Sequence, residues 1–79
     1  MSPTVLRVDG FRFFFFSREE SRMHVHVSHA CGEAKFWLDP SIQIARNHGL
    51  SMQELNQAFR IIEEHYNEIC SAWKKHFNG

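Results

Sequence analysis

The chain has 79 residues, of which 43% are hydrophobic, and its nine basic residues balance nine acidic ones. This length allows a single domain over residues 1–79, and the hydrophobic share excludes a wholly disordered chain. Zero net charge excludes a protein that holds nucleic acid by bulk positive charge, but not one with a local basic patch. A core of this size is marginal, so a partner or a second copy would help to bury surface.

The chain opens without a cationic segment followed by a long apolar run, so we expect no signal peptide and a cytoplasmic location. The longest apolar run, residues 13–16, is too short to span a membrane. Cys31 and Cys70 lack the spacing of a metal site, and we expect both thiols to be reduced.

Residues 1–38 have the pattern of a β-sheet. Asp9-Gly10 predicts a two-residue hairpin turn, because both positions tolerate positive φ. Four strands in meander order are the simplest topology, since consecutive strands tend to be neighbours. The expected strands are residues 4–8, 11–16, 23–28 and 33–38.

Residues 39–79 have the pattern of helices. Asp39-Pro40 is typical of a helix start and predicts a short helix that ends near Gly49. Ser51 and Glu54 form a capping-box pattern that opens a second helix. Apolar residues at spacings of three and four then predict one amphipathic helix almost to the C-terminus, with room for a break near residues 65–67. The predicted fold is α+β, with a four-stranded, mainly antiparallel sheet (ββββ), a short helix, and a long C-terminal helix packed on one face.

Strand alternation separates two faces of this sheet. One face is wholly apolar, and we assign it to the long helix; it carries Leu6, Val8, Phe13, Phe15, Val25, Val27, Ala34, Phe36 and Leu38. The other face mixes cations, imidazoles and aromatic rings; it carries Val5, Arg7, Arg12, Phe14, Phe16, His24, His26, Glu33, Lys35 and Trp37.

The mixed face has two interpretations. Exposed rings on a small domain favour a homo-oligomer or a protein partner that covers them. The same rings can stack on unpaired bases while Arg and Lys hold phosphates, which is typical of RNA binding. Oligomerisation is the simpler interpretation, and the two are compatible.

His24 and His26 point the same way from one strand, about 7 Å apart at Cα. This pair suits acid–base chemistry, since imidazole titrates near neutrality, and RNA cleavage without a metal needs a base, an acid and a cation. The same spacing suits a metal, although a lone HxH pattern is weakly diagnostic. Two half-buried histidines without any chemistry are the simplest interpretation.

Four segments together carry a resemblance to a known family: residues 3–7, the run GFRFFFFS at 10–17, HVHV at 24–27 and EAKFWLDP at 33–40. The tail at residues 50–55, 62–64 and 72–73 fits as well. The chain thus resembles the bacterial domain-of-unknown-function family 4160 over essentially its whole length. The resemblance implies a small bacterial protein that is often encoded beside a second small protein, an arrangement typical of toxin–antitoxin pairs. Members usually have proline before HVH, whereas Met23 stands here.

Three hypotheses follow for function. The first is a toxin–antitoxin-type, metal-independent endoribonuclease in which His24 and His26 are catalytic. The second is a non-catalytic module that binds itself or a small protein encoded nearby. The third is a metal-binding protein that uses the HxH pair. No cofactor and no membrane are expected. The candidate RNA- or partner-binding residues are Arg7, Arg12, Phe14, Lys35 and Trp37.

Overall fold

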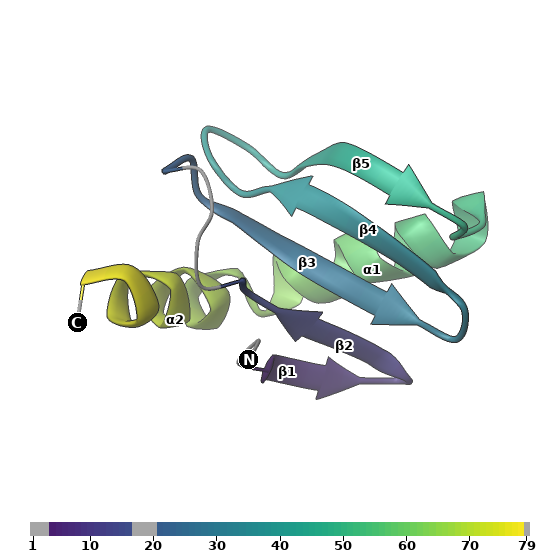
Figure 1. Cartoon of the computed structure of the whole chain (residues 1–79), viewed down its shortest axis with the longest axis horizontal. Helices are drawn as coiled ribbons and strands as arrows, with labels where there is room; N and C mark the ends of the chain where they lie inside the picture. The colour runs from purple at the N-terminus through teal and green to yellow at the C-terminus, as the bar shows by residue number, and fades with distance from the viewer. Residues whose placement is uncertain (1–3, 17–20, 79) are drawn as a thin grey trace.

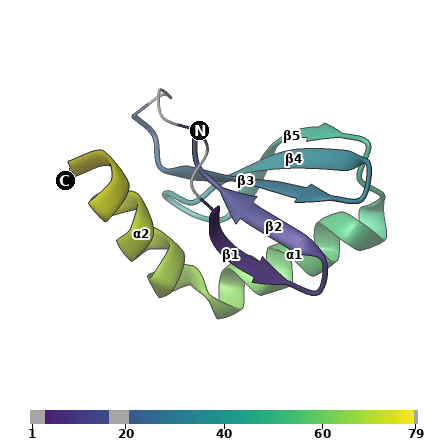
Figure 2. The same ribbon diagram turned by 60° about the horizontal axis from the view of Figure 1, so that its bottom comes forward.

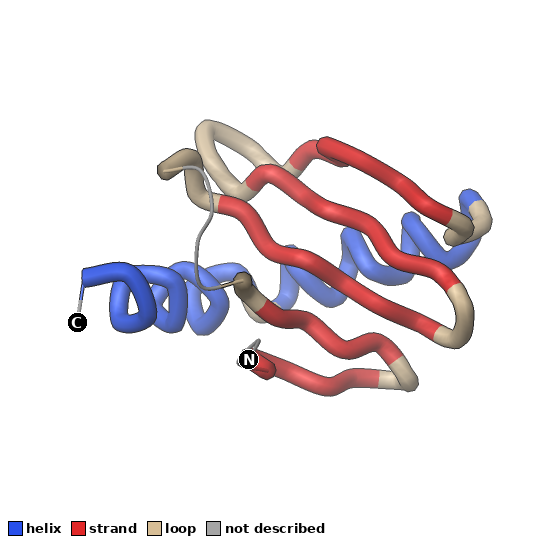
Figure 3. Tube along the Cα trace, viewed as in Figure 1, coloured by secondary structure: helices blue, strands red, loops and turns tan. Residues whose placement is uncertain are grey.

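The computed structural model describes residues 4–16 and 21–78, with the strands and helices in separate halves of the chain (Figure 1, Figure 3). The fold is therefore α+β, as the sequence predicts. The strands are β1 (Thr4–Val8), β2 (Phe11–Phe14), β3 (His24–His29), β4 (Gly32–Trp37) and β5 (Gln43–His48). The helices are α1 (Met52–Glu64) and α2 (Tyr66–Asn78).

The five strands form one antiparallel sheet whose spatial order is the order of the chain. Asp9 and Gly10 join β1 to β2 with φ values of 50° and 83°, the left-handed values that the predicted tight turn needs. The meander of the first four strands is thus confirmed, and the sheet has one strand more than predicted.

The short helix predicted over residues 39–48 is wrong, because these residues lead into β5. β5 pairs antiparallel with β4. Without this partner, the backbone N–H and C=O groups on the outer side of β4 would have no hydrogen bonds within the sheet. Asp39 and Pro40, whose pattern favours a helix start, lie instead in the connection between β4 and β5, with a cis peptide bond between them. Pairing with a neighbouring strand therefore overrides the local helix signal.

The predicted capping box is confirmed. Ser51 Oγ accepts a hydrogen bond from the amide of Glu54 at 3.1 Å, and a Glu54 carboxylate oxygen accepts one from the amide of Ser51 at 2.8 Å. The other Glu54 oxygen lies 2.9 Å from Nδ1 of His29 and so ties the end of β3 to the start of α1. The backbone hydrogen bond from Ser51, with a smaller contribution from His29, lowers the pKa of Glu54.

The helical half is divided at His65. The amide of this residue still donates to the carbonyl of Ile61 at 3.0 Å, and α2 begins at Tyr66, inside the interval where the sequence allows a break. Among the described residues, no helix has the length and apolar character needed to cross a membrane.

One hydrophobic core joins the sheet to both helices. Figure 2 shows α1 running beneath the strands, whereas α2 continues beyond the end of the sheet where β3 begins. The predicted apolar face supplies the sheet side of this core. Val5, assigned to the other face, packs against the core instead, because the register of β1 shifts between Thr4 and Leu6. The fully buried members are Phe13, Val25, Val27, Phe36, Leu38, Ala58, Ile62 and Ile69.

Candidate functional site

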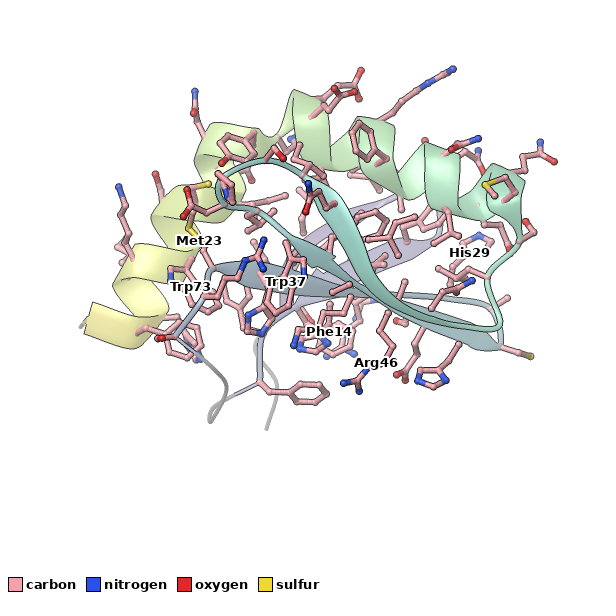
Figure 4. All side chains as sticks on the ribbon, turned by 90° about the horizontal axis from the view of Figure 1, so that it is seen from above. Phe14, Met23, His29, Trp37, Arg46 and Trp73 are labelled. Atoms are coloured by element: carbon pink, nitrogen blue, oxygen red, sulfur yellow. The ribbon has the colours of Figure 1, made fainter. Side chains whose placement is uncertain are left out.

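The mixed face predicted from strand alternation lies on the side of the sheet away from α1. Cross-strand pairing places its residues in two neighbouring rows, one from β1 to β5 and the other from β2 to β5. Figure 4 shows Phe14 and Arg46 on this side. One row consists of Arg7, Arg12, Ser28, Glu33 and His48, and the other of Phe14, His26, Lys35 and Arg46. We call the surface formed by these residues, together with Phe16, Arg22 and Trp37, the distal face.

Cations cover the aromatic rings of the distal face. The Arg12 guanidinium lies 4.5 Å from the ring centre of Phe14. Arg22 lies 4.2 Å from the ring centre of Trp37, and Lys35 Nζ lies 4.6 Å from it. Such stacking holds a flexible cation in one place, so these charges are ordered before any ligand arrives.

Two further hydrogen bonds hold the arginines in position. Arg12 Nε donates to Thr4 Oγ1 at 2.9 Å, and Arg22 Nε donates to the carbonyl of Asp39 at 3.0 Å. The Arg22 guanidinium has five N–H donors, so it can serve further acceptors besides this carbonyl. The distal face is therefore a set of oriented cations on an aromatic layer.

The candidate binding residues differ in how far solvent reaches them. Arg7 is exposed and Arg12 is half-buried, whereas Phe14 is only 4% exposed and Lys35 only 6%. Phe14 thus supports Arg12 from below and has no open face for a base. The exposed ring beside it is Phe16, which is 40% exposed.

The two predicted catalytic histidines have different environments. His24 is fully buried, and its Nδ1 lies 2.7 Å from the carbonyl of Arg22. Its ring lies edge-on to Trp37 at 5.8 Å and to Trp73 of α2 at 5.0 Å between ring centres. A direct role on a large substrate needs contact with solvent, so this position favours a structural role for His24.

His26 is half-buried and belongs to the distal face. Its ring stacks on Phe14 at 5.6 Å and meets the edge of Phe16 at 4.4 Å between ring centres. The rings of His24 and His26 are 5.2 Å apart. The structure therefore keeps the two imidazoles close but opens only His26 to the distal face.

Four residues of the distal face are absent from the sequence prediction: Arg22, Ser28, Arg46 and His48. Arg46 and His48 fall within the wrongly predicted helix. Strict alternation from Ile42 and Ile44 would place both on the apolar side, and the register shift between β4 and β5 turns them to the distal face instead. Arg22 precedes β3, and no periodic pattern marks it.

Basic residues outnumber acidic ones on the distal face of this neutral chain. Basic residues gather on the strands or directly beside them, at Arg7, Arg12, Arg22, Lys35 and Arg46. The helices carry both signs, with Arg60, Lys74 and Lys75 beside Glu54, Glu63, Glu64 and Glu68, whereas Glu33 is the acidic residue among those that define the distal face. The local basic patch that zero net charge leaves room for is therefore present, and it coincides with the distal face.

A pocket opens in the distal face over β3, β4 and β5. The side chains that line it include Phe16, His26, Glu33, Lys35, Arg46 and His48. Within residues 4–16 and 21–78, no group of three or more His, Cys, Asp or Glu side chains is arranged to hold a metal ion. The pocket thus offers cationic and imidazole donors and one carboxylate.

Comparison with known proteins gives a family and no function. Neither the curated proteins nor the solved structures contain a match to this chain. The family described as "Domain of unknown function (DUF4160)" matches residues 10–74, a span that runs from the first hairpin turn into α2 and includes most of the distal face. The resemblance noted in the sequence is thereby confirmed, and the chain belongs to this family of domains of unknown function.

Proposed function

We propose that the distal face binds single-stranded RNA, with its cations on the phosphates. The observation that carries this proposal is the set of guanidinium groups held on aromatic rings at fixed positions across the sheet. Arginine suits phosphate because its planar fork of donors matches the phosphate oxygens. Ordering the side chains in advance reduces the entropy that binding would otherwise cost.

The dimensions of the face suit a flexible strand. Neighbouring strands lie about 4.8 Å apart, so cations from β1 to β5 extend over roughly 19 Å. A single strand can follow such a curved, twisted row, and the exposed ring of Phe16 can stack on an unpaired base. We therefore favour a single strand over a rigid duplex.

The proposed activity is binding rather than cleavage by His24 and His26. The burial of His24 and its contact with the Arg22 carbonyl favour a role in holding the start of β3. His26 alone does not supply both the base and the acid that metal-independent cleavage requires. Metal-independent cleavage can be tested in the same samples. The RNA is incubated with the protein in EDTA and then run on a denaturing gel, where cleavage would appear as shorter fragments.

Fluorescence anisotropy with a labelled single-stranded RNA of mixed sequence tests the proposal. We expect affinity to fall with salt, with a slope of about −0.7 per phosphate contacted. Arg46→Gln should weaken binding several-fold and make the salt slope shallower. Arg60→Gln on α1 is the matched control, because it changes net charge equally at an exposed position outside the distal face. Equal losses in both variants, or no binding at low salt, would contradict the proposal.

A protein partner or a second copy of the chain is the alternative occupant of this face. Phe16 is 40% exposed, and such a ring favours apolar contact. If this alternative holds, the chain should be dimeric in size-exclusion chromatography with light scattering, and Phe16→Ser should make it monomeric. If RNA binding holds, the same variant should lower RNA affinity while the molar mass stays unchanged.

The bacterial toxin–antitoxin setting stays a prediction that rests on the family resemblance, and the cytoplasmic location stays a prediction as well. Where a small protein is encoded beside this chain, expressing the two together and separately tests that setting. Growth that stops only when the neighbour is absent would support it. Growth that is unaffected in both cases would contradict a toxin role for this chain.

A further inference from the structure

We propose that the outer edge of β5 docks an extended strand of a partner protein, in which acidic and apolar side chains alternate. This interaction is separate from RNA binding and does not depend on it. Among the residues that the structure describes, β5 pairs with β4 alone, and Figure 4 views the molecule from the side on which β5 lies. An extended chain alongside β5 would supply partners for the backbone N–H and C=O groups of its outer side.

β5 lacks most of the features that protect an edge strand from pairing. Edge strands are commonly very short, contain proline, or carry a charged side chain that points to the core side of the sheet. β5 has six residues, as many as β3 and β4, and none of them is proline. Its charged residue, Arg46, belongs to the distal face instead. The strand is therefore long enough and open enough to accept a neighbour.

The core side of the sheet is incompletely covered at this edge. Ile44 pairs with the fully buried Phe36 and so belongs to the core side, yet it is 49% exposed. At the opposite edge of the sheet, the apolar residues of β1 are half-buried and pack against the core; they are Val5, Leu6 and Val8. An apolar side chain of an added strand would cover Ile44, as the neighbours of β1 cover its residues.

The helix α1 runs alongside β5 and adds surface for the same strand. Residues 49–51 alone join the end of β5 to the start of α1. At the other end, Ile42, Glu63 and Tyr66 line one pocket, so the end of the helix lies beside the start of the strand. Phe59 lies one turn before Glu63 on the same side of α1 and is half-buried. The added strand therefore meets apolar surface from the helix as well as from β5.

The distal side of β5 determines the charge of the partner strand. Arg46 and His48 are exposed there, and none of the six residues of β5 is acidic. Opposite charges on directly opposed residues stabilise the pairing of strands, whereas like charges destabilise it. An acidic residue opposite Arg46 is thus favoured, with apolar residues at the alternate positions. A second copy of β5 has no carboxylate to place there, so the charges favour a partner protein.

A synthetic peptide of alternating valine and glutamate, about seven residues long, is the probe, and fluorescence anisotropy of its labelled form measures affinity. In an extended strand, the N–H groups of successive residues point to opposite edges. Binding through one edge therefore uses the N–H groups of the valines or those of the glutamates, but not both. We expect N-methylation of one set to weaken binding by about tenfold, and N-methylation of the other set to leave it unchanged.

Variants of the protein locate the peptide on the sheet. Arg46→Gln should weaken binding by about threefold, whereas Arg7→Gln should leave it unchanged, because Arg7 is an equally exposed arginine on β1 at the opposite edge. Ile44→Ser should weaken binding by about fivefold through lost apolar contact. The methylated peptides are compared on the wild-type protein, so that comparison stands even if Ile44→Ser fails to fold.

The proposal is overturned if the peptide does not bind, if both methylated forms bind as well as the parent peptide, or if Arg7→Gln weakens binding as much as Arg46→Gln. A second copy of the chain on this edge would give a dimer in light scattering that Ile44→Ser makes monomeric. That result would also overturn an acidic partner strand as the occupant.

Discussion

Replacing His24 by alanine separates a structural role of this imidazole from a chemical one. The ring is fully buried among Trp37, Trp73 and His26, and its Nδ1 contacts the Arg22 carbonyl. Truncating a buried aromatic ring costs about 3–5 kcal/mol, and a hydrogen bond adds about 1 kcal/mol. Imidazole is smaller than phenyl, so we expect a total loss of about 3 kcal/mol.

That loss is large for a chain of 79 residues, whose total stability should be roughly 4–12 kcal/mol. Urea unfolding followed by tryptophan fluorescence measures it. With a slope of about 1 kcal/mol per molar urea, the midpoint should fall by about 3 M. His26→Ala is the control, because His26 is half-buried, and its midpoint should move by less than about 1 M.

A second variant keeps the test decisive if His24→Ala fails to fold. His24→Phe retains a buried aromatic ring while it removes the contact with the Arg22 carbonyl, so it should cost less than His24→Ala. The reasoning would be refuted if His24→Ala kept the wild-type midpoint and yet abolished an RNA-cleaving activity. That result would assign His24 to the chemistry that the sequence pattern suggests.

Three further predictions concern the fold. Gly32→Ala should cost about 1–3 kcal/mol in urea unfolding, because its Cβ would lie 2.8 Å from backbone atoms of Gly49; an unchanged midpoint would contradict this packing. Ser51→Ala should cost about 1 kcal/mol in urea unfolding, because the helix loses its N-cap. The pKa of Glu54 is lowered in the folded state, so this carboxylate stabilises the fold above its ordinary pKa, and the stabilisation is lost as pH falls through the lowered pKa. The stabilities of wild type and Glu54→Gln, measured by acid unfolding, should therefore converge at low pH. Burial, and to a smaller extent a hydrogen bond with Cys70, raises the pKa of Tyr66. Spectrophotometric titration should therefore show Tyr66 ionising above the ordinary tyrosine range, and the folded state should lose stability as pH rises through that range. Ionisation at the ordinary value would contradict this environment.

Local signals in the sequence predicted local structure correctly. The turn at Asp9-Gly10 and the capping box of Ser51 and Glu54 depend on a few adjacent residues, and both are present. The alternation of the strands also separated the core from the distal face, because one side of each strand must be apolar to be buried. Val5 escaped this rule where the register of β1 shifts.

Features set by distant parts of the chain were not predictable. Asp39-Pro40 satisfies every local condition for a helix start, and only the pairing of β5 with β4 decides otherwise. The burial of His24 depends on Trp73, which lies 49 residues further along the chain on α2 and contacts this first residue of β3. The stacking of Arg22 on Trp37 likewise joins two segments whose approach no period in the sequence indicates.

The chain-order arrangement of the strands has a consequence for how the molecule assembles. Each strand pairs with the strand that precedes it in the chain, so only a short loop must close at each step. The conformational entropy lost on loop closure therefore stays small. Proteins with such sequence-local pairing fold faster than sheets whose neighbours are far apart along the chain. During synthesis the hairpins can therefore form as they leave the ribosome, but the apolar side of the sheet stays exposed until α1 and α2 have been made. A chain that ends before α1 would contain all five strands and leave the apolar side of the sheet exposed to other chains.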